Sequence, residues 1–70
     1  MIKTLEELGY EKKEEEFQII YENADGDKII FITLTESVCV MDCYESYQFA
    51  TMDELKAINA KCEEFGWLDE

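Results

Sequence analysis

The chain has 70 residues, of which eighteen are Asp or Glu, six are Lys and none is Arg or His. The formal net charge of −12 repels phosphate, so we expect no direct binding to nucleic acid. Four Phe, four Tyr and one Trp, within an apolar fraction of 47%, exclude an acidic disordered tail and predict a folded protein. A chain of this length forms one domain, which we expect to span residues 1–70.

Catalysis and metal binding both lack the residues that they usually need. Without His, the usual general base near neutral pH is missing, and no nucleophile lies in a pattern with a base, so we expect no enzyme and no cofactor. Zinc normally takes four Cys or His ligands, whereas this chain has three Cys. An EF-hand loop centred on Gly26 would need carboxylates at Tyr21 and Ile32. We therefore expect no metal site.

The number of Cys residues also indicates the cellular compartment of the protein. An odd number fits a disulfide framework poorly and favours free thiols, which indicates a reducing cytoplasm. No apolar signal segment follows Met1, and the longest apolar run, residues 29–32, is far shorter than the ~20 residues of a membrane span. We expect a cytoplasmic protein that does not contact a membrane.

The first predicted element is a short N-terminal helix from Thr4 to Leu8. Thr4 and Glu7 have the spacing of a capping box, in which each side chain binds the other residue's backbone N–H. Gly9 favours the end of the helix, because glycine readily adopts the left-handed backbone conformation that follows many helices. Leu5 and Leu8 would then face inward.

A hairpin of two strands is predicted next. Residues 11–16 are polar and charged, and form either a loop or an edge strand guarded by charge. Residues 17–22 and 28–34 are both rich in β-formers, with apolar side chains alternating in the first. Between them, Asp25-Gly26 is typical of a two-residue type I′ loop. This loop sets a register with six apolar side chains on one face, in the pairs Tyr21–Ile30, Ile19–Ile32 and Phe17–Leu34.

Residues 38–44 predict a third strand that pairs with the second. Because burying Asp42 would be costly, we predict that the opposite face of this strand belongs to the core. Cys39 and Cys43 would be about 13 Å apart on a strand, too far for a disulfide, while Cys62 could face one of them across the core. The core face then carries Cys39, Met41 and Cys43, and the uncovered face of the sheet carries Ile20, Phe31 and Val40.

The clearest element is a C-terminal helix. Thr51 and Glu54 form a second capping-box pattern at its start, and Gly66 favours its end. We place Phe49 at the junction of sheet and helix, and we leave the position of Tyr47 open. The inward stripe of the helix consists of Leu55, Ile58, Cys62 and Phe65, and Trp67-Leu68 folds back beyond it.

These elements predict an α+β fold with a short N-terminal helix, a three- or four-stranded antiparallel meander, and a C-terminal helix packed on one sheet face. The charge favours a basic protein partner, because dense carboxylates can imitate the phosphates of DNA and block a nucleic-acid enzyme. Solvation alone is one alternative, and a small structural homodimer or interaction module that uses the uncovered sheet face is another. The candidate binding residues are Glu14, Glu15, Glu16, Asp42, Glu45, Tyr47, Glu63 and Glu64.

The chain also resembles a group of small proteins from phages and prophages of Gram-positive bacteria. The segment from Thr51 to Trp67 is similar to their C-terminal end, and the segment from Leu5 to Tyr10 and the Ile-rich hairpin are similar to the same group. The group has no assigned activity, so the resemblance implies no catalytic residues. The resemblance implies that the chain comes from a phage or prophage. Phage genomes also encode small acidic inhibitors of host enzymes and host defence.

Overall fold

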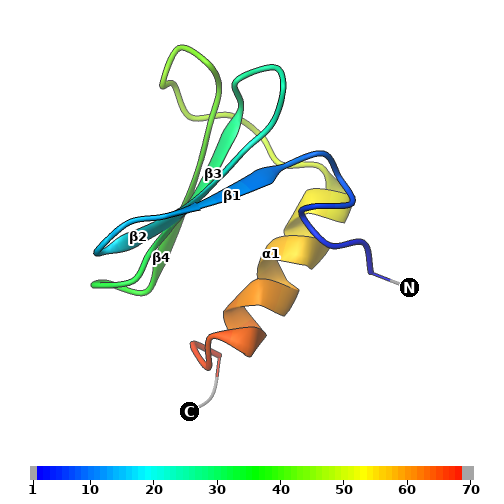
Figure 1. Ribbon diagram of the computed structural model, residues 1–70. Helices are drawn as coiled ribbons and strands as arrows, with labels where there is room; N and C mark the ends of the chain where they lie inside the picture. Colours follow the sequence, from blue (N-terminus) through cyan, green and yellow to red (C-terminus); the bar gives the residue numbers. More distant parts are fainter. Residues whose placement is uncertain (1, 69–70) are drawn as a thin grey trace.

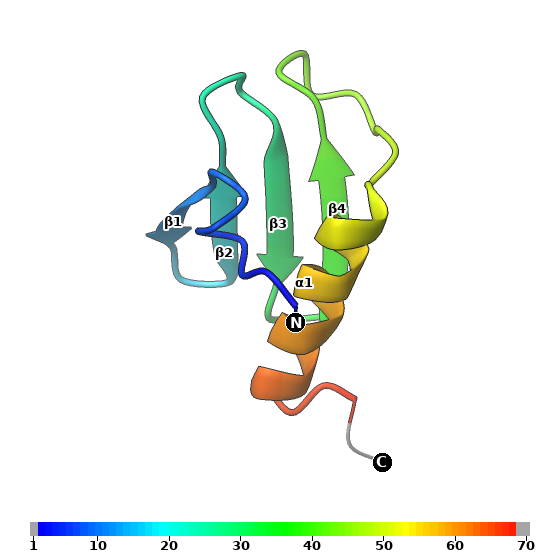
Figure 2. The ribbon, with the colours of Figure 1, turned by 90° about the vertical axis from the view of Figure 1, so that its right-hand side faces the viewer.

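Four antiparallel strands and one helix form an α+β fold in this computed structural model, which describes residues 2–68. The elements are β1 (Glu11–Glu14), β2 (Gln18–Glu22), β3 (Lys28–Ile32), β4 (Ser37–Met41) and α1 (Met52–Glu64). The strands follow one another in the sheet in the order β1-β2-β3-β4, so the charged segment after Tyr10 is the edge strand β1 and not a loop. The helix α1 and the N-terminal segment both lie over the same face of the sheet (Figure 1, Figure 2).

The C-terminal helix begins at the predicted capping box. The Thr51 hydroxyl accepts the Glu54 N–H at 3.2 Å, and the Glu54 carboxylate accepts the Thr51 N–H at 2.8 Å. The inward stripe differs from the prediction, since Leu55 is 47% exposed whereas Ala57 is buried. The N-terminal segment lies beside Ala57, since Leu5 and Ala57 line the same pocket. No helix in residues 2–68 is both long and apolar enough to cross a membrane.

The predicted N-terminal helix is wrong, although its capping box forms. The Thr4 N–H donates to the Glu7 carboxylate at 2.9 Å, and the Glu7 N–H donates to the Thr4 hydroxyl at 3.1 Å. The chain then makes only hydrogen-bonded turns, and the Tyr10 N–H closes back on the Leu5 carbonyl at 3.0 Å. A single turn gains too few hydrogen bonds to offset the cost of starting a helix, so burial of Leu5 decides the conformation.

The hairpin register is one residue away from the prediction. The Asn23 N–H donates to the Asp27 carbonyl at 3.0 Å, and the Gly26 N–H donates to the Asn23 carbonyl at 3.1 Å, so the loop has three residues instead of two. Tyr21 therefore lies opposite Ile29, not Ile30. A shift of one residue turns every side chain of β3 to the other face. The buried residues of β3 are accordingly Ile29 and Phe31.

The predicted core face of β4 is also wrong. Val38 and Val40 lie opposite the buried Phe31 and Ile29, which places them on the helix side of the sheet. The strand ends at Met41, so Asp42 never enters the sheet and the cost of burying its carboxylate does not arise. The opposite side of the sheet, here called the open face, carries five half-buried apolar residues: Ile20, Ile30, Ile32, Cys39 and Met41. Of the three residues predicted to be uncovered, Phe31 and Val40 are wrongly placed and Ile20 is on the open face.

Aromatic side chains fill the space between the sheet and the helix. The Phe31 ring is fully buried and meets the rings of Tyr21 and Phe65 edge-on, with centroids 5.8 and 5.5 Å away. Trp67 folds back as predicted, and its ring lies 6.2 Å from that of Phe31. Pairs of this kind contribute about 0.5–1.5 kcal/mol each beyond the area that they bury. The sulfur of Cys62 cannot face another thiol here, because Cys39 is on the open face and Cys43 is exposed.

Candidate functional site

Three aromatic side chains project into solvent from the connection between β4 and α1. Tyr44 and Tyr47 are each 85% exposed and Phe49 is 99% exposed. The prediction that Phe49 fills the junction of sheet and helix is therefore wrong. Tyr10 occupies that place, since it is buried and its hydroxyl donates to the Glu54 carboxylate at the helix N-terminus. We call the connection of residues 42–50 the aromatic loop.

Hydrogen bonds hold the backbone of the aromatic loop. The Asp42 carboxylate accepts the N–H groups of Tyr44 and Ser46, both at 2.9 Å. The Asp42 N–H donates to the Ser46 carbonyl at 2.8 Å, and the Gln48 N–H donates to the Val40 carbonyl at 3.2 Å. Residues 46–48 thus run back antiparallel along the end of β4. A loop that is already ordered loses less conformational entropy when it binds.

The β2–β3 hairpin loop supports the aromatic loop from the side. A Cβ atom placed on Gly26 would lie 2.7 Å from the Cβ atom of Cys43, which is closer than two carbon atoms can pack. Only glycine allows this approach, and its φ of +87° also favours glycine. Both loops lie at the same end of the molecule, at the top of Figure 1 and Figure 2. We call this end the loop end.

The predicted acidic residues do not form one cluster. Asp42, Glu45 and Tyr47 lie in the loop end, whereas the β1–β2 turn and the C-terminal part of α1 lie at the opposite end of the molecule (Figure 2). Glu14 and Glu64 are each paired with a lysine, at 2.8 and 3.3 Å. The carboxylate of Asp42 binds its own loop and is structural. The predicted residues at the opposite end are Glu14, Glu15, Glu16, Glu63 and Glu64.

The charge around the aromatic loop is one-sided. No lysine occurs between Lys28 and Lys56, whereas five acidic residues do. Lys28 itself lies on β3, opposite Met41, on the open face. The three exposed aromatic side chains therefore belong to a segment in which every charged residue is acidic. The five acidic residues are Glu36, Asp42, Glu45, Asp53 and Glu54.

The contact of Tyr10 with Glu54 fixes the helix beside the loop end. Burial raises the pKa of the Tyr10 hydroxyl, and the Glu54 carboxylate that it binds raises it further. Burial opposes ionisation of Glu54, but hydrogen bonds from the Thr51 backbone and from Tyr10 outweigh it and lower the Glu54 pKa. The pair is thus a phenol donating to a carboxylate at neutral pH, and its role is to position α1.

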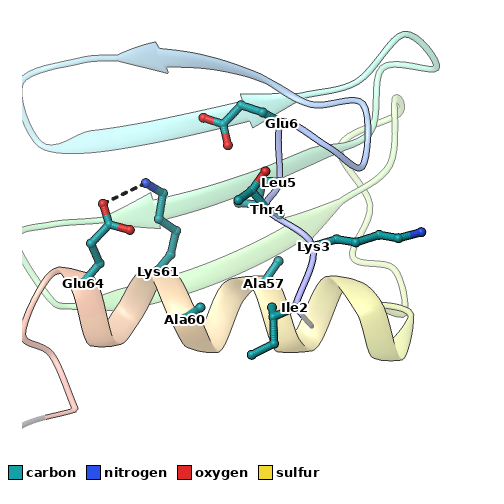
Figure 3. Close-up of a pocket in the computed structure, with 9 residues that line it drawn as sticks. All are labelled: Ile2, Lys3, Thr4, Leu5, Glu6, Ala57, Ala60, Lys61 and Glu64. Carbon is teal, nitrogen blue, oxygen red and sulfur yellow. Dashed lines mark hydrogen bonds and ion pairs between the residues drawn. The ribbon is translucent and has the colours of Figure 1, made fainter.

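A small pocket lies between the N-terminal segment and α1 (Figure 3). It encloses about 140 Å3, with Leu5 and Ala57 among its apolar lining residues. Lys61 also lines it and binds the carboxylate of Glu64, one turn further along α1, at 3.3 Å, as the dashed line in Figure 3 shows. Burial favours the neutral amine of Lys61, but the Tyr21 hydroxyl and the Glu64 carboxylate nearby outweigh burial and raise the Lys61 pKa. The Tyr21 hydroxyl lies near the amine without forming a hydrogen bond of ordinary geometry. Lys61 is therefore protonated at neutral pH and pairs with Glu64 on the same helix.

Neither metal-binding geometry nor similarity to known proteins adds to this picture. Within residues 2–68, no three Cys, Asp or Glu side chains are arranged to hold a metal ion. Comparisons of the chain with protein-family models, with curated proteins and with solved structures give no match. The aromatic loop is thus the candidate site on its own geometry. Of its residues, Tyr44 and Phe49 were not among the predicted binding residues, although three aromatic side chains interspersed with polar ones at positions 44–49 are a signal for them.

Proposed function

We propose that this protein is a non-enzymatic binding protein whose aromatic loop docks onto a basic surface of a partner protein. The observation that supports the proposal is the near-complete exposure of Tyr44, Tyr47 and Phe49 on a loop with a hydrogen-bonded backbone. Exposed aromatic side chains are costly in water and are enriched among the residues that dominate binding energy at interfaces.

The acidic surroundings of the loop favour a cationic partner. Lysine and arginine side chains stack on the faces of tyrosine and phenylalanine rings, and nearby carboxylates steer such a surface toward the loop. A net charge of −12 extends this steering over the whole molecule. The resemblance to phage and prophage proteins makes a cytoplasmic nucleic-acid-handling or defence enzyme of the host the first partner to test. Binding in its basic groove would inhibit such an enzyme.

Affinity capture with matched variants tests the proposal. The protein and a Tyr47→Ala/Phe49→Ala double variant are immobilised and exposed to lysate of a Gram-positive bacterium, at low and at high salt. The control is Leu34→Ala, which removes a side chain that is 73% exposed in the β3–β4 turn, away from the loop end. We expect a partner that Leu34→Ala retains and the double variant loses, with weaker retention at high salt.

Two results would count against the proposal. A partner that the double variant captures as well as the unchanged protein does not bind through the aromatic loop. A partner held equally at low and high salt does not recognise the acidic charge. The second result would leave the acidic residues with the role of keeping the protein soluble.

The open face supports a second candidate function, a homodimer. Ile20, Ile30 and Cys39 form a half-buried apolar row across three strands, and no second helix covers them in residues 2–68. The charged residues of the open face are Glu11, Lys13, Glu22 and Lys28, whose charges cancel. The open face therefore lacks the excess of negative charge that makes other surfaces of the molecule repel a second copy. Sedimentation tests this candidate, because a protein that stays monomeric at high concentration has no such interface.

A further inference from the structure

The two edges of the sheet differ in how they are protected. Edge strands carry unpaired backbone N–H and C=O groups, and charged side chains commonly guard them against pairing with other chains. All four residues of β1 are charged and exposed. The other edge, β4, has the uncharged sequence Ser-Val-Cys-Val-Met. Only the β1 edge is therefore guarded by charge.

The chain itself already pairs with one end of the β4 edge. The Gln48 N–H donates to the Val40 carbonyl, and the Asp42 N–H donates to the Ser46 carbonyl, so residues 46–48 act as a short antiparallel strand. Phe49 then leaves the edge and points into solvent. The outer edge of β4 thus accepts an antiparallel strand at one end and is left open beyond it.

The open part of the edge is centred on Val38. Alternate residues of a strand direct their backbone groups to the same side, so the N–H and C=O of Val38 point outward like the C=O of Val40. Within residues 2–68, neither group of Val38 has a backbone partner outside the sheet, and the Val40 N–H has none either. The Val38 side chain is 38% exposed, which agrees with an open edge. Because Gln48 already lies opposite Val40, the two groups of Val38 remain, and they can form about two hydrogen bonds to an added strand.

Charge decides which strand fits this edge. Glu36 precedes β4, and Asp42 and Glu45 follow it. A second copy would bring the same acidic residues to the edge, whereas an extended segment with lysine or arginine would meet them with opposite charge. We propose that an extended, Lys- or Arg-bearing segment of the partner adds to the sheet antiparallel to β4 at Val38. This inference rests on the proposed function, since it assigns the binding mode of the same basic partner.

A defined peptide tests the inference. The probe is a fluorescent ten-residue peptide of alternating Lys and Thr, and a peptide with Glu in place of Lys is its control. The informative variant is Val38→Pro, which removes an N–H that points outward and is tolerated on an edge strand. The matched variant is Val38→Ala, which shortens the side chain and keeps the backbone donor. Amide hydrogen exchange of the unchanged protein reports on Val38 directly, even if the proline variant fails to fold.

We expect the Lys peptide to bind, the Glu peptide not to bind, and Val38→Pro to weaken binding about tenfold, whereas Val38→Ala changes it about twofold or less. Bound peptide should slow the amide exchange of Val38. Equal binding by the two variants, unchanged exchange, or no binding of the Lys peptide would overturn the inference. Exchange that slows with protein concentration alone would assign the edge to a second copy and also overturn it.

The Tyr47→Ala/Phe49→Ala variant separates this inference from the proposed function. If that variant loses the peptide and Val38→Pro does not, the aromatic loop is the binding surface and strand addition is refuted. If Val38→Pro loses the peptide and the loop variant does not, strand addition stands and the role of the aromatic loop is refuted. Loss of binding in both variants supports both.

Discussion

Replacing Gly26 by Ala should destabilise the protein far more than the same change at Gly9. Both glycines have a positive φ, +87° and +98°. Alanine in this region costs about 1–2 kcal/mol, partly offset by the 0.4–1 kcal/mol that it gains through a less flexible unfolded chain. Nothing lies within 4 Å of a Cβ atom on Gly9, so the net cost there is about 1 kcal/mol.

At Gly26 a second cost is added. The new Cβ atom would lie 2.7 Å from the Cβ atom of Cys43, and overpacking of this kind costs about 1–3 kcal/mol more. The total is about 2–4 kcal/mol. Urea denaturation followed by circular dichroism measures the free energy of unfolding of each variant. In a Cys43→Gly background, Gly26→Ala should cost only about as much as Gly9→Ala. Equal costs for Gly26→Ala and Gly9→Ala in the unchanged background would refute the packing of the hairpin loop against the aromatic loop.

Three further predictions follow from the core and the titrating groups. Ile29→Ala should cost about 2–5 kcal/mol in the free energy of unfolding because Ile29 is fully buried, whereas Ile30→Ala should cost about 1 kcal/mol because Ile30 is on the open face. Glu54→Gln should cost about 1 kcal/mol at pH 7 through weaker hydrogen bonds, as measured by denaturation over a pH series. The Glu54 pKa is lowered from 4.5 in the folded state, so this contribution is complete above pH 4.5 and is lost as the pH falls through the folded value. Iodoacetamide should alkylate the exposed Cys43 much faster than Cys62, because burial excludes the reagent and raises the pKa of the Cys62 thiol, and mass spectrometry distinguishes the two sites.

Each of these has a result that contradicts it. A larger loss of stability at Ile30 than at Ile29 would favour the two-residue hairpin loop, which buries Ile30 in place of Ile29. A constant difference between the protein and Glu54→Gln from pH 7 to pH 3 would show that the carboxylate charge does not contribute. Equal rates of alkylation would show that the C-terminal helix opens as fast as the reagent reacts.

The elements that could be predicted were those with local causes. The capping box at Thr51 and Glu54 depends on two residues three positions apart, and both of its hydrogen bonds form as predicted. The N-terminal capping box forms as well, but one turn without further helical hydrogen bonds does not become a helix. The capping box therefore predicted the local hydrogen bonds at the N-terminus, and not whether the turn continues as a helix.

The hairpin register could not be predicted from its turn. Asp25-Gly26 suits both a two-residue loop and a three-residue loop in which Gly26 takes a positive φ. In the structure, the Asn23 carboxamide oxygen also accepts the N–H groups of Asp25 and Asp27, at 3.0 and 2.9 Å, which stabilises the longer loop. One residue of difference then decided which isoleucines are buried and which lie on the open face.

The candidate site was predicted least well. Tyr47, Asp42 and Glu45 were predicted and lie in the loop end, but Phe49 was assigned to the core and is almost fully exposed. An aromatic residue next to a helix usually packs inward, and only the fold shows that Tyr10, from the other end of the chain, already occupies that space. The predicted acidic residues at the opposite end share their charge with those near the aromatic loop, but they do not lie near them in the structure.

By itself, the amino-acid sequence determined the charge, which is a matter of composition, and the start of the long helix and the meander of strands, which depend on residues close together in the chain. Tertiary structure decided which face of β3 and β4 is buried, which aromatic side chains reach solvent and which sheet edge is open. These outcomes depend on contacts between distant segments, such as Tyr10 with Glu54 and Gly26 with Cys43, whose energies are comparable to the small differences between alternative local conformations.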